Sequence, residues 1–473
     1  MNTNVNIRVR IAPSPTGFLH IGTARTALFN YLFAQKHGGK FVLRIEDTDL
    51  ERSDQKYEKD IFEGLKWLGI DADESPEAGG PFAPYRQSER TASYRRCVEK
   101  LLAESKAFWC PHTKEELEAE QKSLMTEKRP PVHWCQARDG KETTGIIRFK
   151  SPREKEAVRF IDLVREDIEF SVSQIGDFSI AKNLDTPLYN FAVVVDDEEM
   201  QISHVIRGED HIANTPKQVL LTKALGFQLP EYVHLPLILG SDRSKLSKRH
   251  GATSVIEYKE QGYLPEVLFN FMAFLGWNPG GEKEIFTKED LINEFSLEKV
   301  QKSGAVFDIT KLDWMNGEYI RAFKPEELLK RAKGFLPPES GKYPEDFILK
   351  VLSLEQPRLK KLSEIGERTE YFFKEPEYDK ELLRWKTMSD QEVAGSLDEA
   401  IKILSKLETS ASKEDIEQMF LAEIGEGDKG KVLWPLRAAL SGKKASPGPF
   451  EIVEILGIEE TIKRLQKATD LLK

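Results

Sequence analysis

The sequence predicts an α/β fold in its N-terminal half, built on a parallel sheet that an inserted segment interrupts, followed by a helical C-terminal half. Three observations lead to this prediction. A strand, a loop, a helix and a second strand follow one another within about 40 residues, the length that a right-handed parallel crossover needs. Residues 107–183 differ in character from the apolar runs on either side of them. After Gly251 the pattern is mostly helical.

The first strand and helix are marked by local signals. Apolar residues alternate with arginines over residues 7–11, which predicts a strand, and the proline-containing segment 13–17 predicts a loop. A helix begins near His20 and ends at Gly38, a residue type common at helix C-termini. Residues 41–45 alternate again and complete a βαβ unit. A second amphipathic helix carries its apolar residues on one face: Tyr57, Ile61, Leu65 and Leu68.

The inserted segment 107–183 contains short strands, a helix rich in lysine and glutamate, and a break at Pro130 and Pro131. Two apolar, β-rich runs follow at residues 189–195 and 204–207, so the parallel sheet is expected to resume there. Residues 235–239 predict one more strand. Further on, residues 336–342 are typical of a linker, and the remainder to Lys473 is helical by pattern.

The composition is that of an ordinary globular chain: 473 residues, 40 % hydrophobic, 31 % charged, with a formal net charge of −10. Collagen-like, disordered and membrane classes are thereby excluded, and the longest apolar run, residues 267–277, falls short of the ~18 residues of a membrane span. The three cysteines and the polar N-terminus, which lacks a signal peptide, predict a cytoplasmic protein. The acidic total does not exclude a nucleic-acid partner, since a local basic face can bind phosphates.

Residues 10–23 place a helix N-terminus beside His20 and Gly22, directly after a strand and a loop. The unpaired N–H groups and the dipole of such an end favour phosphate, and Gly22 lets a nucleotide approach the backbone. The alternative is a tight turn in which His20 only caps the helix. A basic run at residues 242–250 follows a predicted strand, where open α/β sheets bind ligands, although a solvated loop is the alternative for such a run.

A Cys-x-His pair and a His-x-Cys pair, separated by 20 residues, predict a metal site in the insertion: Cys110, His112, His133 and Cys135. Thiolate and imidazole are zinc ligands, and alternate residues of a strand share one face, so two strands could form a tetrahedral structural site. A capping box from Thr113 to Glu116 opens the helix between the pairs. The alternative is buried free cysteines with hydrogen-bonded histidines.

Taken together, these passages resemble the bacterial glutamyl-tRNA synthetases, a family of class I aminoacyl-tRNA synthetases. The resemblance extends over residues 8–450, and it rests on the segments 10–17 with 20–23, 44–49, 85–90, 204–210 with 214–216, 245–249, 311–316, 434–437 and 441–447. It implies ATP-dependent ligation of L-glutamate to the 3′ end of tRNA(Glu) through a glutamyl-adenylate, with Mg²⁺ on the phosphates. In this family activation of glutamate waits for tRNA.

The resemblance also implies an arrangement of domains. Residues 1–106 and 184–250 would form a Rossmann-like catalytic domain, and residues 107–183 an inserted domain that binds the acceptor stem. Residues 251–323 would contact the tRNA stem, and residues 324–473 would form an all-α anticodon-binding domain. We expect the protein to act as a monomer and without a membrane.

Site residues carry over from the family position by position. Catalysis is expected of His20, Lys245 and Lys248, and ATP binding of His20, Gly22, Thr23, Lys245, Lys248 and Arg249. Glutamate binding is expected of Arg10, Ala12, Ser14, Glu46, Tyr189 and Arg207, because two carboxylates require guanidinium groups and an ammonium requires an acid. Val193 replaces an asparagine of some members, so one substrate hydrogen bond is absent or comes from Asn190. Some members hold zinc with Cys-x-Cys and Cys-x-His, and two of those four ligand types differ here.

Four other functions are considered. A non-discriminating enzyme would also charge tRNA(Gln) with glutamate, and one sequence does not decide this. The shortened relative that modifies a base of aspartate tRNA lacks a helical C-terminal half, and glutaminyl-tRNA synthetases usually carry a β-barrel there. A non-catalytic tRNA-binding paralogue would be expected to have lost His20 or Lys248, and both are present.

Overall fold

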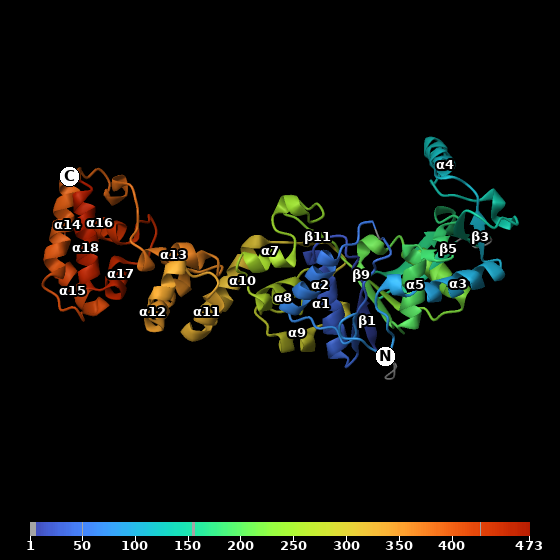
Figure 1. Ribbon diagram of the computed structural model, residues 1–473, viewed down its shortest axis with the longest axis horizontal. Helices are drawn as coiled ribbons and strands as arrows, with labels where there is room; N and C mark the ends of the chain where they lie inside the picture. The colour runs from blue at the N-terminus through green and yellow to red at the C-terminus, as the bar shows by residue number, and fades with distance from the viewer. Residues whose placement is uncertain (1–5, 50, 154–156, 426) are drawn as a thin grey trace. The chain divides into compact units, whose positions relative to one another are not determined.

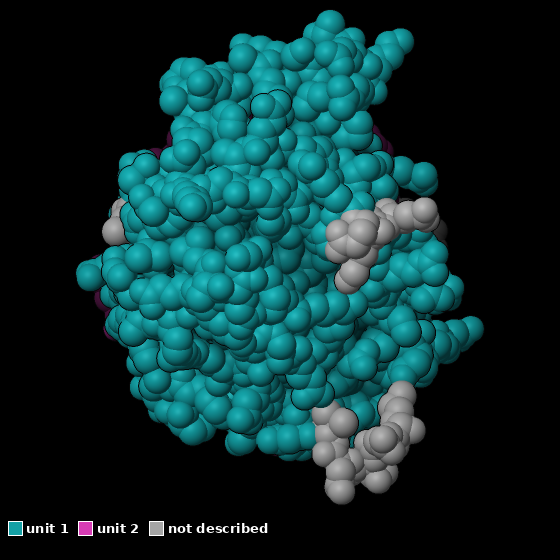
Figure 2. Space-filling view, turned by 90° about the vertical axis from the view of Figure 1, so that its right-hand side faces the viewer, with its two compact units in different colours: residues 1–259, 264–309 teal, residues 260–263, 310–473 magenta. Residues whose placement is uncertain are grey.

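The computed structural model describes residues 6–49, 51–153, 157–425 and 427–473, and of Lys248 it describes the backbone alone (Figure 1). The chain divides into two compact units, residues 1–259 with 264–309 (unit 1) and residues 260–263 with 310–473 (unit 2). Figure 2 shows one face of unit 1. Each unit contains a hydrophobic core. Over the described residues, no helix combines the length and the apolar character that crossing a membrane requires.

The N-terminal βαβ unit is confirmed. It consists of β1 (Arg8–Ile11), α1 (Ile21–Lys36) and β2 (Lys40–Leu43), and the two strands are parallel, with Arg8 opposite Lys40 and Ile11 opposite Leu43. All four residues of β1 are buried, as expected of a parallel strand that is covered on both faces. α1 ends where predicted, with Gly38 at a φ of 62°.

A second parallel pair belongs to a neighbouring four-stranded sheet. β9 (His204–Gly208) and β10 (Glu231–Leu235) are connected by α6 (Thr215–Leu225) and pair in parallel. β9 lies beside β1, where the Ser203 N–H donates to the Arg8 carbonyl at 2.9 Å. The carboxyl ends of β1, β9 and β10 therefore meet at one edge, which is where open α/β sheets bind ligands.

The strand predicted at residues 189–195 is wrong, because these residues belong to helix α5 (Tyr189–Glu199). Every side chain from Phe191 to Asp197 is buried. A helix that is buried on all sides has the same continuous apolar run as a buried strand, so its periodicity does not distinguish the two. The β-branched valines of this run added to the error, since their β-propensity is overridden by tertiary packing.

The inserted segment contributes to two sheets. Its antiparallel sheet consists of β3 (Ala107–Cys110), β4 (Ile146–Phe149), β7 (Ser179–Asn183) and β8 (Thr186–Pro187). The hairpin of β5 (Ala157–Asp162) and β6 (Glu166–Ser171) instead joins β10, with Asp162 opposite Tyr232. Side chains of the insertion and of the residues on either side of it in the chain share one core, among them Val42, Ile147 and Phe191. The helix α4 (Lys114–Thr126) buries no residue, and Figure 1 shows it extending away from β3.

The predicted strand at residues 235–239 is divided in two. β10 ends at Leu235 and β11 (Ile238–Leu239) pairs with β12 (Ala305–Val306), because Pro236 lacks the N–H that a continuous ladder needs.

The predicted second helix is confirmed as α2, which buries Ile61 and Leu65. Unit 1 also contains these helices: α2 (Gln55–Trp67), α3 (Thr91–Ala103), α8 (Pro265–Ala273) and α9 (Lys288–Glu294), while α7 (Val255–Glu260) ends at the boundary of the units.

Unit 2 is helical over its described residues, as predicted. Its helices are α10 (Ile309–Ala322), whose first residue belongs to unit 1, α11 (Pro325–Ala332), α12 (Glu345–Glu355), α13 (Glu364–Phe373), α14 (Asp390–Leu404), α15 (Lys413–Ile424), α16 (Gly430–Ser441), α17 (Pro449–Leu456) and α18 (Ile458–Asp470). The predicted linker contains a short 3₁₀ helix, Pro338–Lys342, with Ser340 buried. The boundaries proposed for four domains stay a prediction.

Candidate active site

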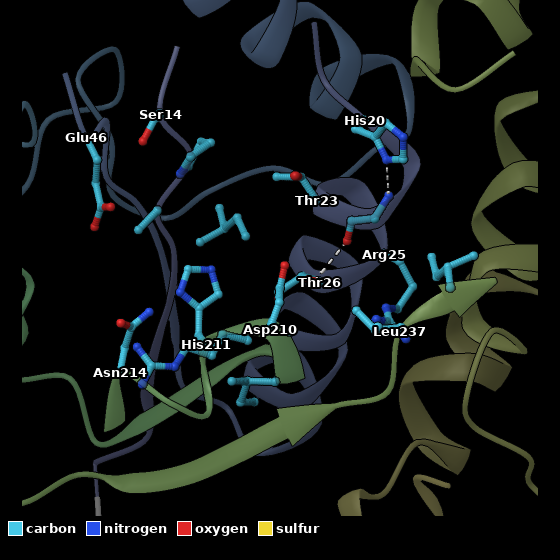
Figure 3. A pocket seen from close by; sticks show the side chains of 18 of the residues that line it. Ser14, His20, Thr23, Arg25, Thr26, Glu46, Asp210, His211, Asn214 and Leu237 are labelled. Carbon is cyan, nitrogen blue, oxygen red and sulfur yellow. Dashed lines mark hydrogen bonds between the residues drawn. The ribbon is translucent and has the colours of Figure 1, made fainter. Parts of the chain in front are cut away.

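A cavity of about 640 Å³ opens at the carboxyl ends of β1 and β9, beside the N-terminus of α1. Figure 3 shows Ser14 and Glu46 on one side of it and His20 and Thr23 on the other. Ten of the residues predicted from the sequence line it: Arg10, Ala12, Ser14, His20, Gly22, Thr23, Glu46, Tyr189, Arg207 and Lys245. Segments far apart in the chain thus converge on one cavity.

His20 is the N-cap of α1, and it also lines the cavity. Its Nδ1 accepts a hydrogen bond from the Gly22 N–H at 3.1 Å, drawn as a dashed line in Figure 3. Because Nδ1 is the acceptor, a neutral ring carries its proton on Nε2. Burial and the nearby Lys245 lower the pKa of His20, which favours the neutral ring. The capping role and a ligand-binding role are therefore compatible, because they use different nitrogens.

The basic loop, residues 242–250, supplies one described basic side chain to the cavity. Lys245 lines it and pairs with Asp210, Nζ to Oδ2 at 3.0 Å. Arg249, predicted to bind ATP, is not a lining residue, because its Nη2 donates to Asp242 at 3.0 Å and to the Ser244 hydroxyl. The side chain of Lys248 lies outside the described residues, and its backbone belongs to the 3₁₀ helix Lys248–His250.

Buried charges surround the opposite end of the cavity. Arg10, expected to bind a substrate carboxylate, donates from Nε to Asp197 at 3.1 Å. Arg44 is fully buried and contacts Asp197 at 2.8 Å and Glu46 at 3.2 Å. Burial raises the pKa of Glu46, and Arg44 and Arg10 offset part of that effect. Burial alone would lower the pKa of Arg44, and the carboxylates of Asp197, Asp196 and Glu46 together raise it above its ordinary value.

Arg207 is buried, and one nitrogen of its guanidinium group has no hydrogen-bond acceptor among the described residues. It lines the cavity and is 5 % exposed, and its Nη2 donates to the Thr215 hydroxyl at 2.7 Å. Its Nη1 is buried and finds no hydrogen-bond partner among the described residues. A buried guanidinium nitrogen without an acceptor is costly, and a carboxylate ligand would satisfy it.

Tyr189 begins α5 and lines the cavity, where its hydroxyl lies 3.0 Å from Nδ1 of His211. Burial and the nearby Arg207 lower the pKa of His211 to about 4, so this ring is neutral at neutral pH. Neither Val193 nor Asn190 is among the lining residues. Val193 is buried in the core, and Asn190 accepts a hydrogen bond from Gln218 at 3.0 Å. The prediction that Asn190 supplies a substrate contact finds no support in this geometry.

Sequence reasoning did not assign five polar lining residues: Arg25, Thr26, Asp210, His211 and Asn214. Asp210 and Asn214 belong to the motifs at residues 204–210 and 214–216, so their place shortly after Arg207 in the chain is an available signal. Arg25 is held by the carbonyls of Leu275 and Pro236, 2.8 Å and 2.7 Å away. Those contacts connect residues more than 200 positions apart, and no local pattern indicates them.

The four predicted metal ligands do come together in the insertion. One ligand atom from each of Cys110, His112, His133 and Cys135 lies within 4.8 Å of the others. The two Sγ atoms are 3.8 Å apart, and Nδ1 of His112 lies 3.4 Å and 3.6 Å from them. Tetrahedral zinc bonded to two sulfurs and two nitrogens would separate the sulfurs by about 3.8 Å and a sulfur from a nitrogen by about 3.5 Å. The donor set and its spacing therefore fit zinc.

One half of the prediction about this cluster is wrong. Cys110 ends strand β3, but His133 and Cys135 lie in a loop before the 3₁₀ helix Gln136–Asp139, not on a second strand. Contacts with side chains, and not pairing with a strand, hold this loop in position. The Cys135 N–H donates to Asp177 at 3.1 Å, and Nδ1 of His133 contacts Glu120 of α4. His133 consequently presents Nε2 to the Cys110 sulfur, 3.7 Å away.

Comparison with known proteins agrees with this arrangement. Residues 6–314 match the family of tRNA synthetases class I (E and Q), catalytic domain, and residues 327–469 match an anticodon binding domain. A glutamate–tRNA ligase of Sulfurihydrogenibium sp. (strain YO3AOP1) is 46 % identical over 97 % of this chain and 98 % of that protein. The glutamate–tRNA ligase 1 of Caldicellulosiruptor saccharolyticus is 44 % identical over 98 % of this chain and 99 % of its own length.

Solved structures give the same result. The crystal structure of a glutamate tRNA ligase from Elizabethkingia meningosepticum, in complex with its amino acid, matches with a TM-score of 0.88 and 36 % identity. The match covers 99 % of this chain and 100 % of that one. The cavity at the sheet edge, the helical second unit and these near full-length matches agree with one another: the chain belongs to the class I aminoacyl-tRNA synthetases, in the family of the glutamate–tRNA ligases.

Proposed function

We propose that this protein ligates L-glutamate to the 3′ end of tRNA(Glu), through a glutamyl-adenylate formed from ATP. One observation carries the proposal. A single cavity joins a buried arginine with an unpartnered nitrogen, Arg207, to a helix N-terminus capped by His20. The first suits a carboxylate and the second suits a phosphate. The two substrates of an adenylation reaction would therefore meet inside it.

In the first step the α-carboxylate of glutamate attacks the α-phosphorus of ATP, and pyrophosphate leaves with the electron pair of the broken P–O bond. The protein needs no nucleophile, since such a reaction is accelerated by positioning and by cancelling negative charge. His20 would donate from Nε2 to a phosphate oxygen, and Lys245 and Lys248 would neutralise the phosphates. ATP enters as its magnesium complex. The lining carboxylates Glu46 and Asp210 are already paired with Arg44 and Lys245, which is consistent with a magnesium ion carried by the nucleotide.

Glutamate would bind at the end of the cavity that Figure 3 shows with Ser14 and Glu46. Arg207 and Arg10 would bind its carboxylates, and Glu46 its ammonium group. The raised pKa of Glu46 suits this role, because an ammonium ligand stabilises the ionised carboxylate in a buried place. Ala12, Gly22 and Thr23 line the same cavity and would contact the substrates. Arg249 would contact ATP only after leaving Asp242.

In the second step the 2′-hydroxyl of the terminal adenosine attacks the carbonyl carbon of the adenylate. An ester forms, AMP leaves, and the hydroxyl proton is released. We propose that residues 107–183 bind the acceptor stem, that residues 251–323 contact the stem and that residues 324–473 read the anticodon. We also propose that the protein works as a monomer in the cytoplasm, consistent with three free cysteines.

A structural zinc ion is part of this proposal. Cys110, His112, His133 and Cys135 would hold it, and it would link strand β3 to the loop that follows α4. All four ligands come from the protein, which is typical of a structural site and leaves no position open for a substrate. Glu120 and Asp177 hold His133 and the Cys135 backbone in place. Such outer contacts are typical of metal-binding histidines.

The decisive experiment is charging of labelled glutamate onto separate transcripts of tRNA(Glu) and tRNA(Gln), with ATP–pyrophosphate exchange measured with and without each tRNA. We expect charging of tRNA(Glu). Charging of tRNA(Gln) as well would identify the non-discriminating enzyme. If neither tRNA is charged and no exchange occurs, the protein is a tRNA-binding paralogue and the proposal is wrong.

A further inference from the structure

We propose that His234 is a positioning residue: held by Asp162, it orients the Arg207 guanidinium toward the carboxylate of the amino-acid substrate. The inference rests on the proposed function, because it assumes that Arg207 binds glutamate. Neither His234 nor Asp162 lines the cavity, so neither would touch the substrate. They would act through Arg207.

The three residues stand side by side on neighbouring parallel strands. Arg207 lies on β9 directly opposite His234 on β10. Asp162 is the last residue of β5, and it pairs with Tyr232 of β10. A line of polar groups thus crosses the sheet from the hairpin of the inserted segment to the cavity. The side chains of His234 and Asp162 are both 0 % exposed, so water does not compete for their hydrogen bonds.

Asp162 fixes the tautomer of His234. Its Oδ2 accepts from the His234 backbone N–H at 2.9 Å and lies 2.7 Å from His234 Nδ1. Its Oδ1 accepts from the backbone N–H groups of Val164 and Arg165, at 3.0 Å and 2.8 Å. Since N–H donors occupy both oxygens, the carboxylate acts as an acceptor toward His234. Nδ1 must then carry the proton, and Nε2 of the neutral ring keeps a free lone pair.

That lone pair faces Arg207. The Nε of Arg207 lies 3.3 Å from His234 Nε2, and its Nη2 donates to the Thr215 hydroxyl at 2.7 Å. The Thr215 hydroxyl itself lies 3.0 Å from His234 Nε2. Because the guanidinium is planar and rigid, two held nitrogens determine the direction of the third. The third is Nη1, the buried nitrogen that has no partner among the described residues.

Burial lowers the pKa of His234, with Arg207 adding to the effect and Asp162 opposing it. The ring therefore stays neutral and keeps an acceptor for the arginine. Without that acceptor, Arg207 would keep its contact with Thr215 but could rotate about it. A freely rotating guanidinium binds a carboxylate less well, because ordering it on binding costs conformational entropy.

Two substitutions separate the two sides of the His234 ring. His234→Asn can keep the donor that faces Asp162 but removes the acceptor that faces Arg207. His234→Gln can place its amide oxygen near the position of Nε2 and keep that acceptor. His204→Asn is the matched control, since His204 is also a buried histidine, lies on the neighbouring strand β9 and does not line the cavity.

The measurement is aminoacylation of tRNA(Glu) under separate titration of glutamate and of ATP. We expect His234→Asn to raise the KM for glutamate about tenfold and the KM for ATP less than twofold. His234→Gln should recover most of the glutamate affinity, and His204→Asn should match the wild type. A KM for glutamate that is unchanged in His234→Asn, or one that rises in parallel with the KM for ATP, would overturn the inference.

Two further measurements keep the test decisive if His234→Asn does not fold. Thr215→Val removes the other partner of Arg207 without changing volume, and it should raise the KM for glutamate several-fold, whereas Thr215→Ser should not. In an Arg207→Ala background, Thr215→Val should add nothing to the loss, because Thr215 acts through the arginine. Additive effects would contradict this. If the wild-type protein charges no tRNA with glutamate, the proposed function fails instead of this inference.

Discussion

His20 serves two purposes with its two ring nitrogens. Nδ1 accepts the Gly22 N–H and caps α1, while Nε2 is left for a ligand in the cavity. A capping histidine and a catalytic histidine are usually regarded as alternatives. Here one geometry supports both, because the capping bond fixes the tautomer that places a donor on the other nitrogen.

Two variants of His20 separate these purposes. His20→Asn keeps a good N-cap acceptor, so the free energy of unfolding should stay within about 0.5 kcal/mol of the wild type. It removes the Nε2 donor, so ATP–pyrophosphate exchange in the presence of tRNA should fall about 100-fold. His20→Ala should show the same kinetic loss and a further loss of stability of about 1 kcal/mol. An asparagine variant with wild-type exchange would reduce His20 to a cap.

His204 predicts a pH dependence of stability. Burial lowers its pKa from 6.5 to about 4, with His37 adding to the effect. Between pH 6.5 and 4 the unfolded chain binds a proton that the folded chain does not, so the contribution of His204 is greatest above pH 6.5 and falls as the pH drops toward 4.

Urea unfolding of the wild type and of His204→Asn at pH 7 and pH 5 measures this contribution. We expect the free energy of unfolding of the wild type to fall by about 2 kcal/mol more than that of the variant between these two pH values. Subtracting the two proteins removes the effect of the other titrating groups. Parallel pH curves would show that folding does not shift the pKa of His204.

At the scale of elements, α4 is unusual because it buries no residue, yet the loop that follows it carries two of the four metal ligands. Its capping box stabilises the first turn, where the Glu116 N–H donates to the Thr113 hydroxyl at 3.2 Å. Beyond that turn, the contact of Glu120 with His133 joins the helix to the metal cluster. The position of α4 should therefore depend on the metal.

Cys135→Ser and Cys97→Ser form a matched pair for this prediction, since both cysteines are buried and free but only Cys135 belongs to the cluster. The wild type and Cys97→Ser should contain about one zinc ion per chain, and Cys135→Ser much less. Amide hydrogen exchange over residues 114–126 should accelerate in Cys135→Ser. A zinc content near zero in the wild type would contradict the site, and unchanged exchange would contradict its connection to α4.

At the scale of the whole molecule, an acidic protein with a net charge of −10 is proposed to bind an acidic nucleic acid. The total charge opposes the approach of tRNA, and local contacts between basic side chains and phosphates must overcome it. These contacts release counterions from the tRNA when they form. Binding should accordingly weaken steeply as salt is added.

The dissociation constant for tRNA(Glu), measured by fluorescence anisotropy, should rise at least tenfold between about 50 and 200 mM KCl. The logarithm of the constant should be linear in the logarithm of the salt concentration. A tRNA of unrelated anticodon serves as the control, and its binding should show a similar slope with lower affinity. Binding that does not respond to salt would mean that the protein does not recognise tRNA through its phosphates.

The sequence by itself determined those features that depend on residues a few positions apart. The end of α1 at Gly38, the capping box of Thr113 and the βαβ unit follow from local spacing, and all three are found in the structure. The four metal ligands at residues 110–135 are also apparent in the sequence, because a cysteine and a histidine two residues apart are typical zinc ligands. Ten of the site residues that the resemblance assigns line one cavity. They could be assigned from the sequence because each belongs to a short motif that is recognisable without its neighbours in the fold.

Only the tertiary structure decided what depends on contacts between distant segments. Residues 189–199 form a helix because neighbouring elements bury it on every side, and a buried apolar run does not reveal its own periodicity. Arg10 contacts Asp197, 187 positions away in the chain, and Arg207 contacts His234 on the neighbouring strand. Neither partner could be named from the sequence. The pKa values of Glu46 and His211 follow from burial, which is a property of the packed molecule. Short-range signals choose the elements, and long-range packing determines which charges meet and how strongly they interact.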